Sequence, residues 1–274
     1  MTDRIRIGKK EFDLRNHTYV MGILNVTPDS FSDGGKFTET DAALYHAQEM
    51  LDAGAAVIDV GGESTRPGHV QISDEEEIAR IVPVIAALRE RFDAPISVDT
   101  YKSAVAAEAL RAGADLVNDI WGLKYDADMA AVIAESGAAC CLMHNRDNTD
   151  YGDFFEDVKN DLRESILLAE RANIASDKIL LDPGVGFAKS YEQNLCAIRQ
   201  VGELRELGYP VLLGTSRKSV IGLTLDLPAD QRVEGTLATT VIGVMQGCGF
   251  VRVHDVAENV RAIAMTEAVL YARK

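Results

Sequence analysis

The sequence predicts an α/β protein in which eight parallel strands alternate with helices around a closed (β/α)8 barrel, the TIM-barrel fold. Short apolar runs recur along the 274 residues with helical stretches between them. No linker rich in proline, serine or charge divides the chain, and polar residues follow nearly every apolar run. Barrels of this kind reach this length as one domain, so we expect a single domain over residues 1–274.

The expected strands are the apolar runs themselves. Runs without a polar residue at every second position suit strands buried on both faces, as in a parallel sheet covered by helices. The runs are Val20–Leu24, Ala56–Val60, Pro95–Val98, Asp115–Val117, Ala139–Met143, Ile179–Leu181, Pro210–Leu213 and Phe250–Val253.

The helices between them are predicted from their ends and their apolar spacing. Apolar residues stand at helical spacing between Asp41 and Asp52, and Ser73 with Glu76 forms a capping box that begins the next helix. Pro83 lies inside that helix and predicts a kink or an early break. Glycines that precede four strands can end helices in the left-handed conformation: Gly54, Gly113, Gly137 and Gly208.

An open, doubly wound sheet is the alternative architecture for the same alternation. Such a sheet binds its ligand at one switch point in the strand order, and its first strand often leads into a GxGxxG motif. This chain has no such motif there, and its polar residues follow nearly every strand. Both features favour the barrel, because its strand ends converge on one mouth.

Composition restricts the class of protein. A formal net charge of -15 disfavours nonspecific binding to nucleic acid or anionic membrane, because both attract basic surfaces. The start Met1–Arg4 lacks the basic residues and apolar core of a signal peptide, which predicts a cytoplasmic protein. The uncharged run Gly235–Val251 contains polar residues and predicts a buried helix instead of a membrane span. The cysteines form no CxxC pair and are expected to be buried free thiols: Cys140, Cys141, Cys196 and Cys248.

The polar residues at the expected mouth fall into two chemical groups. Carboxylates and amides can hydrogen-bond a flat heterocycle, and cationic side chains can hold anionic groups. Each residue alone could equally be a helix cap, a turn residue or a solvated charge, and only their convergence favours a site. The set is Asn25, Asp59, Glu63, Arg66, Asp99, Asn118, Asp119, His144, Asp182, Ser216, Lys218, Arg252 and His254.

Two long glycine-bearing loops follow the first two strands and are expected to act as lids over the mouth. Asn25, Asp29 and Asp33 in the first loop could bind Mg2+ through oxygen atoms, shared with substrate phosphates. Motifs for nucleotide-phosphate binding, serine hydrolysis and zinc proteolysis are absent from the sequence.

Six motifs together resemble those of the dihydropteroate synthase family, over about Val20 to Val256. They are MGILNVTPDSFSDGG from Met21, VIDVGGESTRPG from Val57, SVDT from Ser97, DPGVGF from Asp182, GTSRKS from Gly214 and VRVH from Val251. The resemblance implies a TIM-barrel transferase of folate synthesis and a sulfonamide target. It would join 6-hydroxymethyl-7,8-dihydropterin pyrophosphate to p-aminobenzoate and release pyrophosphate, as a homodimer that uses Mg2+.

The resemblance also implies a role for each residue. Asp99, Asn118, Asp182 and Lys218 would bind the edge of the pterin ring, with Arg252 stacked on its face. Ile120 and Met143 would form an apolar wall, His254 would lie at the pyrophosphate, Asn25 would meet Mg2+, and Gly214 begins a substrate-binding motif. Phe31, Asp33, Thr65, Arg66 and Pro67 would close over the second substrate, beside Phe187 and Ser219. The expected catalytic set is Asp33, Thr65, Arg66, Asp99, Lys218 and Arg252.

One departure and two alternatives accompany this resemblance. After Met143 and His144 the chain continues Asn-Arg-Asp-Asn-Thr, where many relatives carry a Met-Gln-Gly-like run. Methyltransferases that pass a methyl group from methyltetrahydrofolate to a corrinoid protein share the barrel, but should lack the STRPG and SRKS loops together. A noncatalytic pterin-binding paralogue should have lost residues in the first two loops, whereas Asn25, Asp33 and Thr65 are present.

Overall fold

The computed structural model describes residues 3–26, 39–63 and 70–272. Within these ranges eight parallel strands form one sheet, in the order β8-β7-β6-β5-β4-β3-β10-β9. A bridge between Leu181 and Val211 joins β8 to the start of β9 and closes the sheet into a barrel. The strands are β3 (Tyr19–Asn25), β4 (Val57–Gly61), β5 (Ile96–Asp99), β6 (Leu116–Asp119), β7 (Ala139–Met143), β8 (Ile179–Asp182), β9 (Leu212–Leu213) and β10 (Phe250–Val253). The predicted strands and barrel are confirmed, and the doubly wound sheet is not what forms.

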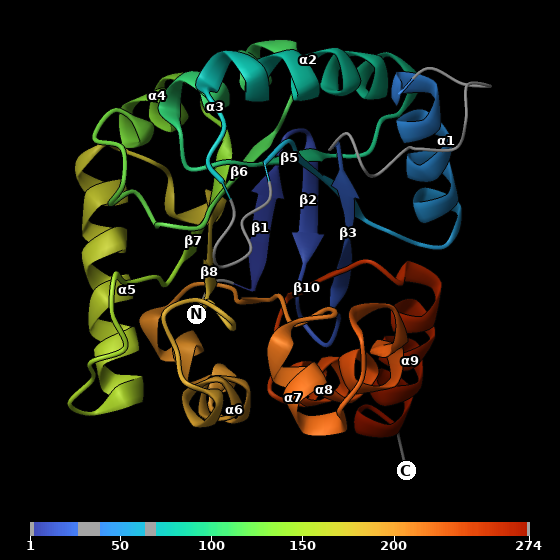
Figure 1. The fold of residues 1–274 in the computed structure, drawn as a ribbon, viewed down its shortest axis with the longest axis vertical. Helices are drawn as coiled ribbons and strands as arrows, with labels where there is room; N and C mark the ends of the chain where they lie inside the picture. The colour runs from blue at the N-terminus through green and yellow to red at the C-terminus, as the bar shows by residue number, and fades with distance from the viewer. Residues whose placement is uncertain (1–2, 27–38, 64–69, 273–274) are drawn as a thin grey trace.

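The helices surround the strands (Figure 1). They are α1 (Glu39–Asp52), α2 (Asp74–Arg91), α3 (Ser103–Ala112), α4 (Met129–Ser136), α5 (Phe154–Arg171), α6 (Tyr191–Arg199), α7 (Ser219–Leu225), α8 (Val233–Met245) and α9 (Val256–Leu270). A 3-10 helix, Val201–Leu207, lies between α6 and β9. The four glycines expected to end helices all have positive φ, at Gly54, Gly113, Gly137 and Gly208. No helix in the described ranges is long and apolar enough to cross a membrane.

Helix α2 differs from expectation at its proline. The Ser73 hydroxyl accepts a hydrogen bond from the Glu76 amide at 3.2 Å, but the Glu76 carboxylate pairs with Arg80, so only half of the predicted capping box forms. The helix then continues through Pro83 to Arg91, so the predicted early break is wrong. Burial of one apolar face outweighs the roughly 3 kcal/mol cost of an internal proline, since each buried aliphatic side chain contributes about 1.5–3 kcal/mol. That face is Ile81, Val84, Ile85 and Leu88.

The structure contains an antiparallel hairpin at the N-terminus that the sequence analysis did not predict. It comprises β1 (Arg4–Ile7) and β2 (Lys10–Asp13). Its apolar residues Ile5, Ile7 and Phe12 pack against the first inward-facing residues of the barrel strands. The hairpin therefore covers the end of the barrel where the parallel strands begin, and the polar residues that follow the strands lie at the opposite end.

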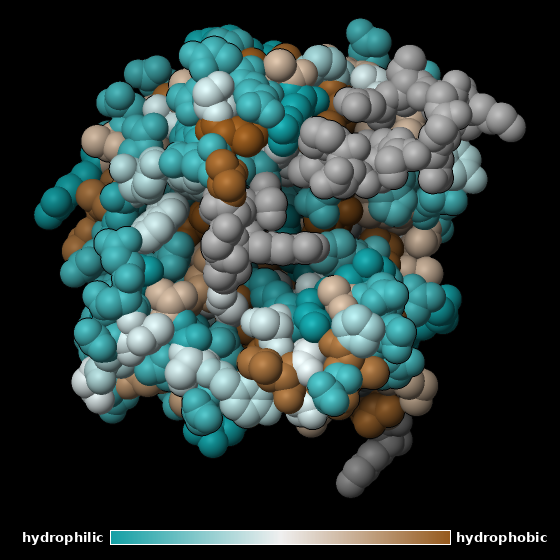
Figure 2. Space-filling model, viewed as in Figure 1, coloured by the Kyte–Doolittle hydropathy of each residue, from teal (hydrophilic) through white to brown (hydrophobic). Residues whose placement is uncertain are grey.

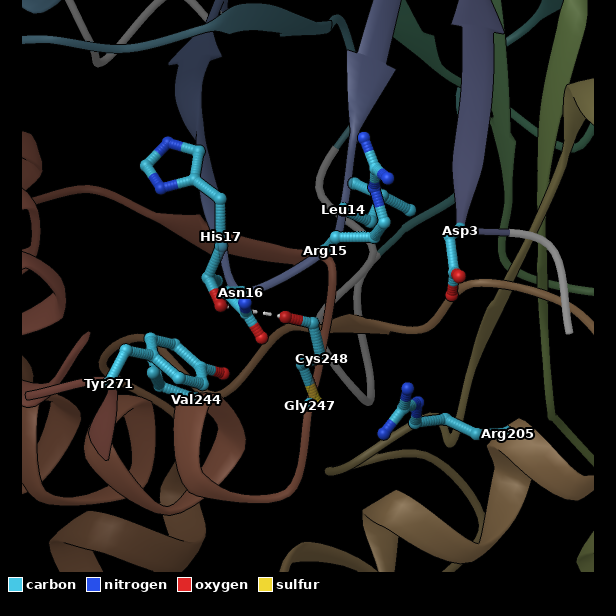
Figure 3. A pocket seen from close by; sticks show the side chains of 11 residues that line it. Asp3, Leu14, Arg15, Asn16, His17, Arg205, Val244, Gly247, Cys248 and Tyr271 are labelled. Carbon is cyan, nitrogen blue, oxygen red and sulfur yellow. Dashed lines mark hydrogen bonds between the residues drawn. The ribbon is translucent and has the colours of Figure 1, made fainter. Parts of the chain in front are cut away.

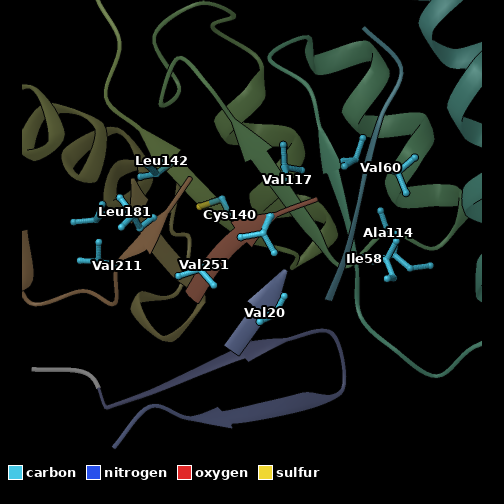
Figure 4. Close-up of a cluster of buried hydrophobic side chains, with 14 of the residues drawn as sticks. Val20, Ile58, Val60, Ala114, Val117, Cys140, Leu142, Leu181, Val211 and Val251 are labelled. Atoms are coloured by element: carbon cyan, nitrogen blue, oxygen red, sulfur yellow. The ribbon is translucent and has the colours of Figure 1, made fainter. Parts of the chain in front are cut away.

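The main core lies between the barrel and its helices. Outward-facing strand residues such as Val20, Ile58, Leu142 and Leu181 belong to it (Figure 4). Inward-facing residues such as Leu116 and Leu180 fill the barrel. Both faces of the strands are buried, which explains why the apolar runs show no alternation.

Two burial predictions are only partly correct. Cys140, Cys141 and Cys248 are buried free thiols, whereas Cys196 is half-buried. Helix α8 overlaps the uncharged run but leaves Ile242 and Met245 exposed, at 37% and 62%. A run without charges can build an exposed apolar face as readily as a buried helix, and sequence hydropathy does not separate the two.

Candidate active site

Arg252 joins two carboxylates inside the barrel mouth. It projects from β10, and its Nε donates to Asp59 Oδ2 at 2.6 Å while a terminal nitrogen donates to Asp99 Oδ2 at 2.7 Å. Asp59 ends no strand but lies within β4, and Asp99 is the last residue of β5. Although burial opposes it, the two carboxylates raise the pKa of Arg252, so the guanidinium remains charged.

Asp99 keeps one oxygen available. It is 7% exposed, and its Oδ1 accepts no hydrogen bond from any residue in the described ranges. Burial raises the pKa of Asp99 to about 7, even though the Arg252 guanidinium opposes the shift. A buried carboxylate oxygen without a partner is costly in a folded protein, which is consistent with a donor supplied by a ligand.

Asp182, at the end of β8, lies close to Gly214 and Lys218, which follow β9. Asp182 is the last residue of β8, and its carboxylate accepts a hydrogen bond from the Gly184 amide at 2.7 Å. A side-chain carbon built on Gly214 would lie 3.5 Å from Asp182 Oδ2 and 3.9 Å from Lys218 Nζ, so this glycine faces both groups. Burial lowers the pKa of Lys218 to about 8, with Asp182 opposing the shift, and burial raises the pKa of Asp182.

An apolar wall stands beside these charges. Ile120 and Met143 are buried in one cluster with Tyr101, and Phe187 packs against it. The Lys218 ammonium lies 4.9 Å from the centre of the Phe187 ring. Asn118, at 5% exposure, lies on β6 in register with Asp99. The mouth thus combines apolar side chains with hydrogen-bonding groups, which suits a polar heterocycle.

The other predicted residues lie at the rim. His254 Nδ1 is 2.9 Å from Ser216 Oγ, and the His254 amide donates to the same hydroxyl. Ser219 is exposed and begins α7. Phe31, Asp33, Thr65, Arg66 and Pro67 lie outside the described residues.

The candidate metal ligand Asn25 ends β3 and is exposed. A carbon built on Gly61 would lie 3.8 Å from both Asn25 Oδ1 and Asp99 Oδ2, so oxygen atoms flank this glycine. Oxygen donors suit Mg2+. The described ranges contain no group of three or more His, Cys, Asp or Glu side chains that could hold a metal alone.

Two residues of the wider mouth have structural roles. The Asp119 carboxylate accepts hydrogen bonds from the amides of Trp121 and Leu123. It is therefore a turn residue, which is one of the alternatives that the sequence allows. Glu63 binds the Lys102 ammonium at 2.6 Å and the Tyr101 hydroxyl at 2.6 Å in a buried cluster. Neither group points to substrate binding.

A separate cavity of about 380 Å³ lies at the other end of the barrel (Figure 3). Residues that precede β3 and β10 line it, among them His17 and Cys248. Its side chains are engaged with the protein, since Arg15 pairs with Asp13 at 2.5 Å and His17 with Glu267 at 2.9 Å. The converging groups of the mouth make the better site.

Known proteins match the chain over nearly its whole length. The family model described as "Pterin binding enzyme" matches residues 21–254. The dihydropteroate synthase of Clostridium beijerinckii is 59% identical over 97% of this chain and 99% of its own, and that of Bacillus subtilis is 52% identical over 98% and 94%.

The chain belongs to the dihydropteroate synthase family. Solved dihydropteroate synthases share its fold. The enzyme from Clostridium difficile, solved in the presence of pteroic acid, is 51% identical with a TM-score of 0.90, over 98% of this chain and 100% of that one. The enzyme from Xanthomonas albilineans with 4-aminobenzoic acid is 39% identical with a TM-score of 0.94, over 100% of both chains. Dihydropteroate synthases are transferases, and the chain is an enzyme of this class.

Sequence reasoning left one residue beside this dihydropteroate synthase site out of the final set and overlooked another. Asp59 belonged to the wider mouth set but not to the final one, although it holds Arg252. Lys189 was not singled out, yet its ammonium is buried behind the loop that carries Phe187. Lys189 follows the DPGVGF motif by two residues, and this position was the only available signal.

Proposed function

We propose that this chain condenses 6-hydroxymethyl-7,8-dihydropterin pyrophosphate with p-aminobenzoate to give 7,8-dihydropteroate and pyrophosphate. The observation that carries the proposal is the unpartnered Asp99 oxygen beside Arg252, in a mouth that also holds Asn118 and Asp182. We further propose that residues 1–274 act as one domain in the cytoplasm.

The pterin ring would be bound at its edge and on its face. A pterin carries adjacent N–H donors, which suit carboxylate acceptors, and a carbonyl and ring nitrogens, which suit ammonium and amide donors. Asp99 and Asp182 would accept from the ring, while Asn118 and Lys218 would donate to it. Arg252 would lie against one face, with Ile120 and Met143 on the apolar side.

Catalysis would rest on charge, without a protein nucleophile. Pyrophosphate leaves a carbon attached to an electron-rich ring that can stabilise positive charge, so an ionised Asp99 would favour the developing cation. The amine of p-aminobenzoate then forms the new C–N bond, and neither a covalent enzyme intermediate nor a strong base is required.

The leaving pyrophosphate needs cationic partners. Asn25 would contribute an oxygen to Mg2+, and His254 would lie near the pyrophosphate, beside Ser216. Mg2+, when bound, would neutralise part of the charge on the leaving group.

The second substrate would lie over the pterin. Phe187 and Ser219 would border p-aminobenzoate, and Phe31, Asp33, Thr65, Arg66 and Pro67 would close over it. The relative from Xanthomonas albilineans that was solved with 4-aminobenzoic acid supports this substrate class. Sulfonamides would compete here, in line with the Yersinia pestis relative solved as a sulfonamide drug complex, which is 44% identical with a TM-score of 0.92 over 98% of this chain and 100% of that one.

A homodimer would cover the exposed apolar residues of α7, α8 and α9. They include Leu223, Met245, Met265 and Val269, each between 62% and 68% exposed. Hydrophobic residues are visible over this part of the surface (Figure 2). Residues within Gly235–Val251 and Val256–Tyr271 contribute most of this face.

The test is a product assay with purified protein and the pterin pyrophosphate, with and without p-aminobenzoate and Mg2+. We expect dihydropteroate, identified by mass spectrometry, only when both substrates and the metal are present. Pterin binding without product would instead support the noncatalytic paralogue.

A further inference from the structure

A buried Lys–His pair lies behind the site and has no role in the reaction proposed above. His144 directly follows β7 and is 0% exposed. Its Nδ1 is 2.8 Å from Lys189 Nζ, and its Nε2 is 2.9 Å from Asp161 Oδ2.

The geometry fixes the protonation of this pair. An ammonium only donates, so His144 Nδ1 must accept from Lys189, and the ring proton on Nε2 is donated to Asp161. Burial lowers the pKa of His144 to about 4, with the Asp161 hydrogen bond opposing the shift, and this agrees with a neutral ring. The imidazole is therefore a fixed link between Lys189 and helix α5, which carries Asp161.

Lys189 holds the loop between β8 and α6. Besides His144, its Nζ donates to the carbonyls of Gly184 at 2.9 Å and Phe187 at 3.0 Å. Gly184 and Gly186 have φ of 68° and 88°, so the loop curls around the ammonium in a conformation that other residues rarely adopt. A carbon built on Gly184 would stand 1.9 Å from the His144 carbonyl, which shows how closely the loop approaches β7.

The same loop supplies two contacts to Lys218. The Lys218 ammonium donates to the Val185 carbonyl, and it lies 4.9 Å from the centre of the Phe187 ring. Both contacting residues lie within the turn whose carbonyls Lys189 binds. The position of the Lys218 ammonium thus depends on a loop that Lys189 organises from behind.

The segment that departs from the family pattern supports the same arrangement. Arg146 binds both oxygens of Asp161, at 2.5 and 3.1 Å, and lies 4.4 Å from the centre of the Tyr151 ring. The Tyr151 hydroxyl donates to the Ala188 carbonyl at 2.9 Å. The loop after β7 is therefore tied to the loop after β8 through Arg146 and Tyr151 as well as through His144.

We propose that Lys189, oriented by His144, is a positioning residue that places the Val185 carbonyl and the Phe187 ring so that Lys218 can bind the pterin. The inference rests on the proposed role of Lys218 in pterin binding. It predicts that substitution of Lys189 weakens pterin binding only while Lys218 is present.

A double-mutant cycle tests this dependence. Affinity for 6-hydroxymethyl-7,8-dihydropterin pyrophosphate is measured by isothermal titration for the full chain, Lys189→Met, Lys218→Ala and the double variant. We expect Lys189→Met to weaken binding about tenfold, or about 1.4 kcal/mol. In the Lys218→Ala background we expect Lys189→Met to reduce the affinity by less than a further twofold.

Two further variants keep the test decisive if Lys189→Met unfolds. His144→Leu removes the acceptor and should show the same dependence on Lys218, whereas His144→Gln can accept from Lys189 and donate to Asp161 and should bind normally. The matched control is Lys178→Met, because Lys178 also donates to a loop carbonyl, that of Gly137, away from the mouth. It should leave affinity unchanged.

The outcomes separate the two proposals. Normal affinity in Lys218→Ala would refute the proposed role of Lys218 itself. The positioning role would be refuted if Lys218→Ala weakens pterin binding but Lys189→Met causes an equal loss of affinity in the wild-type chain and in Lys218→Ala. A Lys189→Met protein that binds the pterin normally would also refute it.

Discussion

The two carboxylate oxygens of Asp99 have different environments. One oxygen is held by Arg252 at 2.7 Å, while the other has no partner among the described residues. Because burial raises its pKa to about 7, Asp99 changes charge within the range of ordinary assays. Its protonation state should therefore govern binding of the ring.

We expect affinity for the pterin to fall as the pH is lowered through about 7. Asp99 is ionised above its pKa and accepts hydrogen bonds there, whereas protonation below it removes the acceptor. Titration with 6-hydroxymethyl-7,8-dihydropterin, which carries no phosphate, measures this without the ionisation of pyrophosphate. An affinity that stays constant from pH 8 down to pH 5.5 would rule out the proposed contact.

The predictable site residues are those that follow strands. Asp99 and Asp182 end their strands, and Asn118 is the residue before the last of β6. The barrel brings such positions together whatever the details of packing. The pairing of Arg252 with Asp59 depends on which inward-facing side chains meet across the barrel. A single sequence carries no signal for that choice.

At the scale of elements, the loop between β8 and α6 depends on buried polar groups. Lys189 and His144 lie among Asp161, Arg146 and Lys124, and burial lowers the pKa of both Lys189 and His144. A buried group whose pKa is lowered makes stability depend on pH, because the unfolded chain binds protons in a pH range where the folded chain does not.

We expect His144→Gln to reduce the fall in the free energy of unfolding that occurs as the pH is lowered. The unfolded chain binds a proton at His144 below about pH 6.5, whereas the folded chain binds it only near pH 4, so stability is lost as the pH falls through this window. The loss amounts to at most about 3 kcal/mol. Urea unfolding between pH 7.5 and 4.5 measures it.

The exposed His46 provides the control for this profile, since His46→Gln should leave the acid side unchanged. Parallel profiles for the wild-type chain and His144→Gln would show that His144 does not carry the effect.

The elements themselves were largely predictable, with two instructive exceptions. Apolar runs and left-handed glycines locate strands and helix ends because both follow from local burial and backbone geometry. Helix α2 passes through Pro83 because its packed face compensates for the proline, and this compensation is a tertiary effect. The β1–β2 hairpin was overlooked because four-residue strands with charged alternate positions resemble an ordinary terminus.

At the scale of the whole molecule, the barrel has one polar mouth and one apolar flank. The hairpin covers the opposite end, while α7, α8 and α9 expose large apolar side chains. An exposed apolar surface of this kind commonly marks an interface between proteins. The proposed homodimer would bury it.

We expect the wild-type chain to be a dimer and the Met245→Lys, Met265→Lys double variant to be a monomer. Both side chains are more than 60% exposed, so the substitutions should leave the fold intact while adding charges to the interface. Size-exclusion chromatography with light scattering gives the mass. Tyr45→Lys on α1, at a residue 69% exposed, is the control and should remain dimeric. A monomeric wild-type chain would refute this interface.

The most direct test of the proposed reaction is the rate of dihydropteroate formation in a single turnover, compared between the wild-type chain and Asp99→Asn. Asparagine keeps the size of the side chain but cannot supply the negative charge that favours the developing cation. We expect the wild-type chain to form dihydropteroate and the variant to form it more than tenfold more slowly, which corresponds to more than about 1.4 kcal/mol of transition-state stabilisation. Equal rates would contradict the catalytic role of the Asp99 charge, and a wild-type chain that forms no product would contradict the proposed reaction.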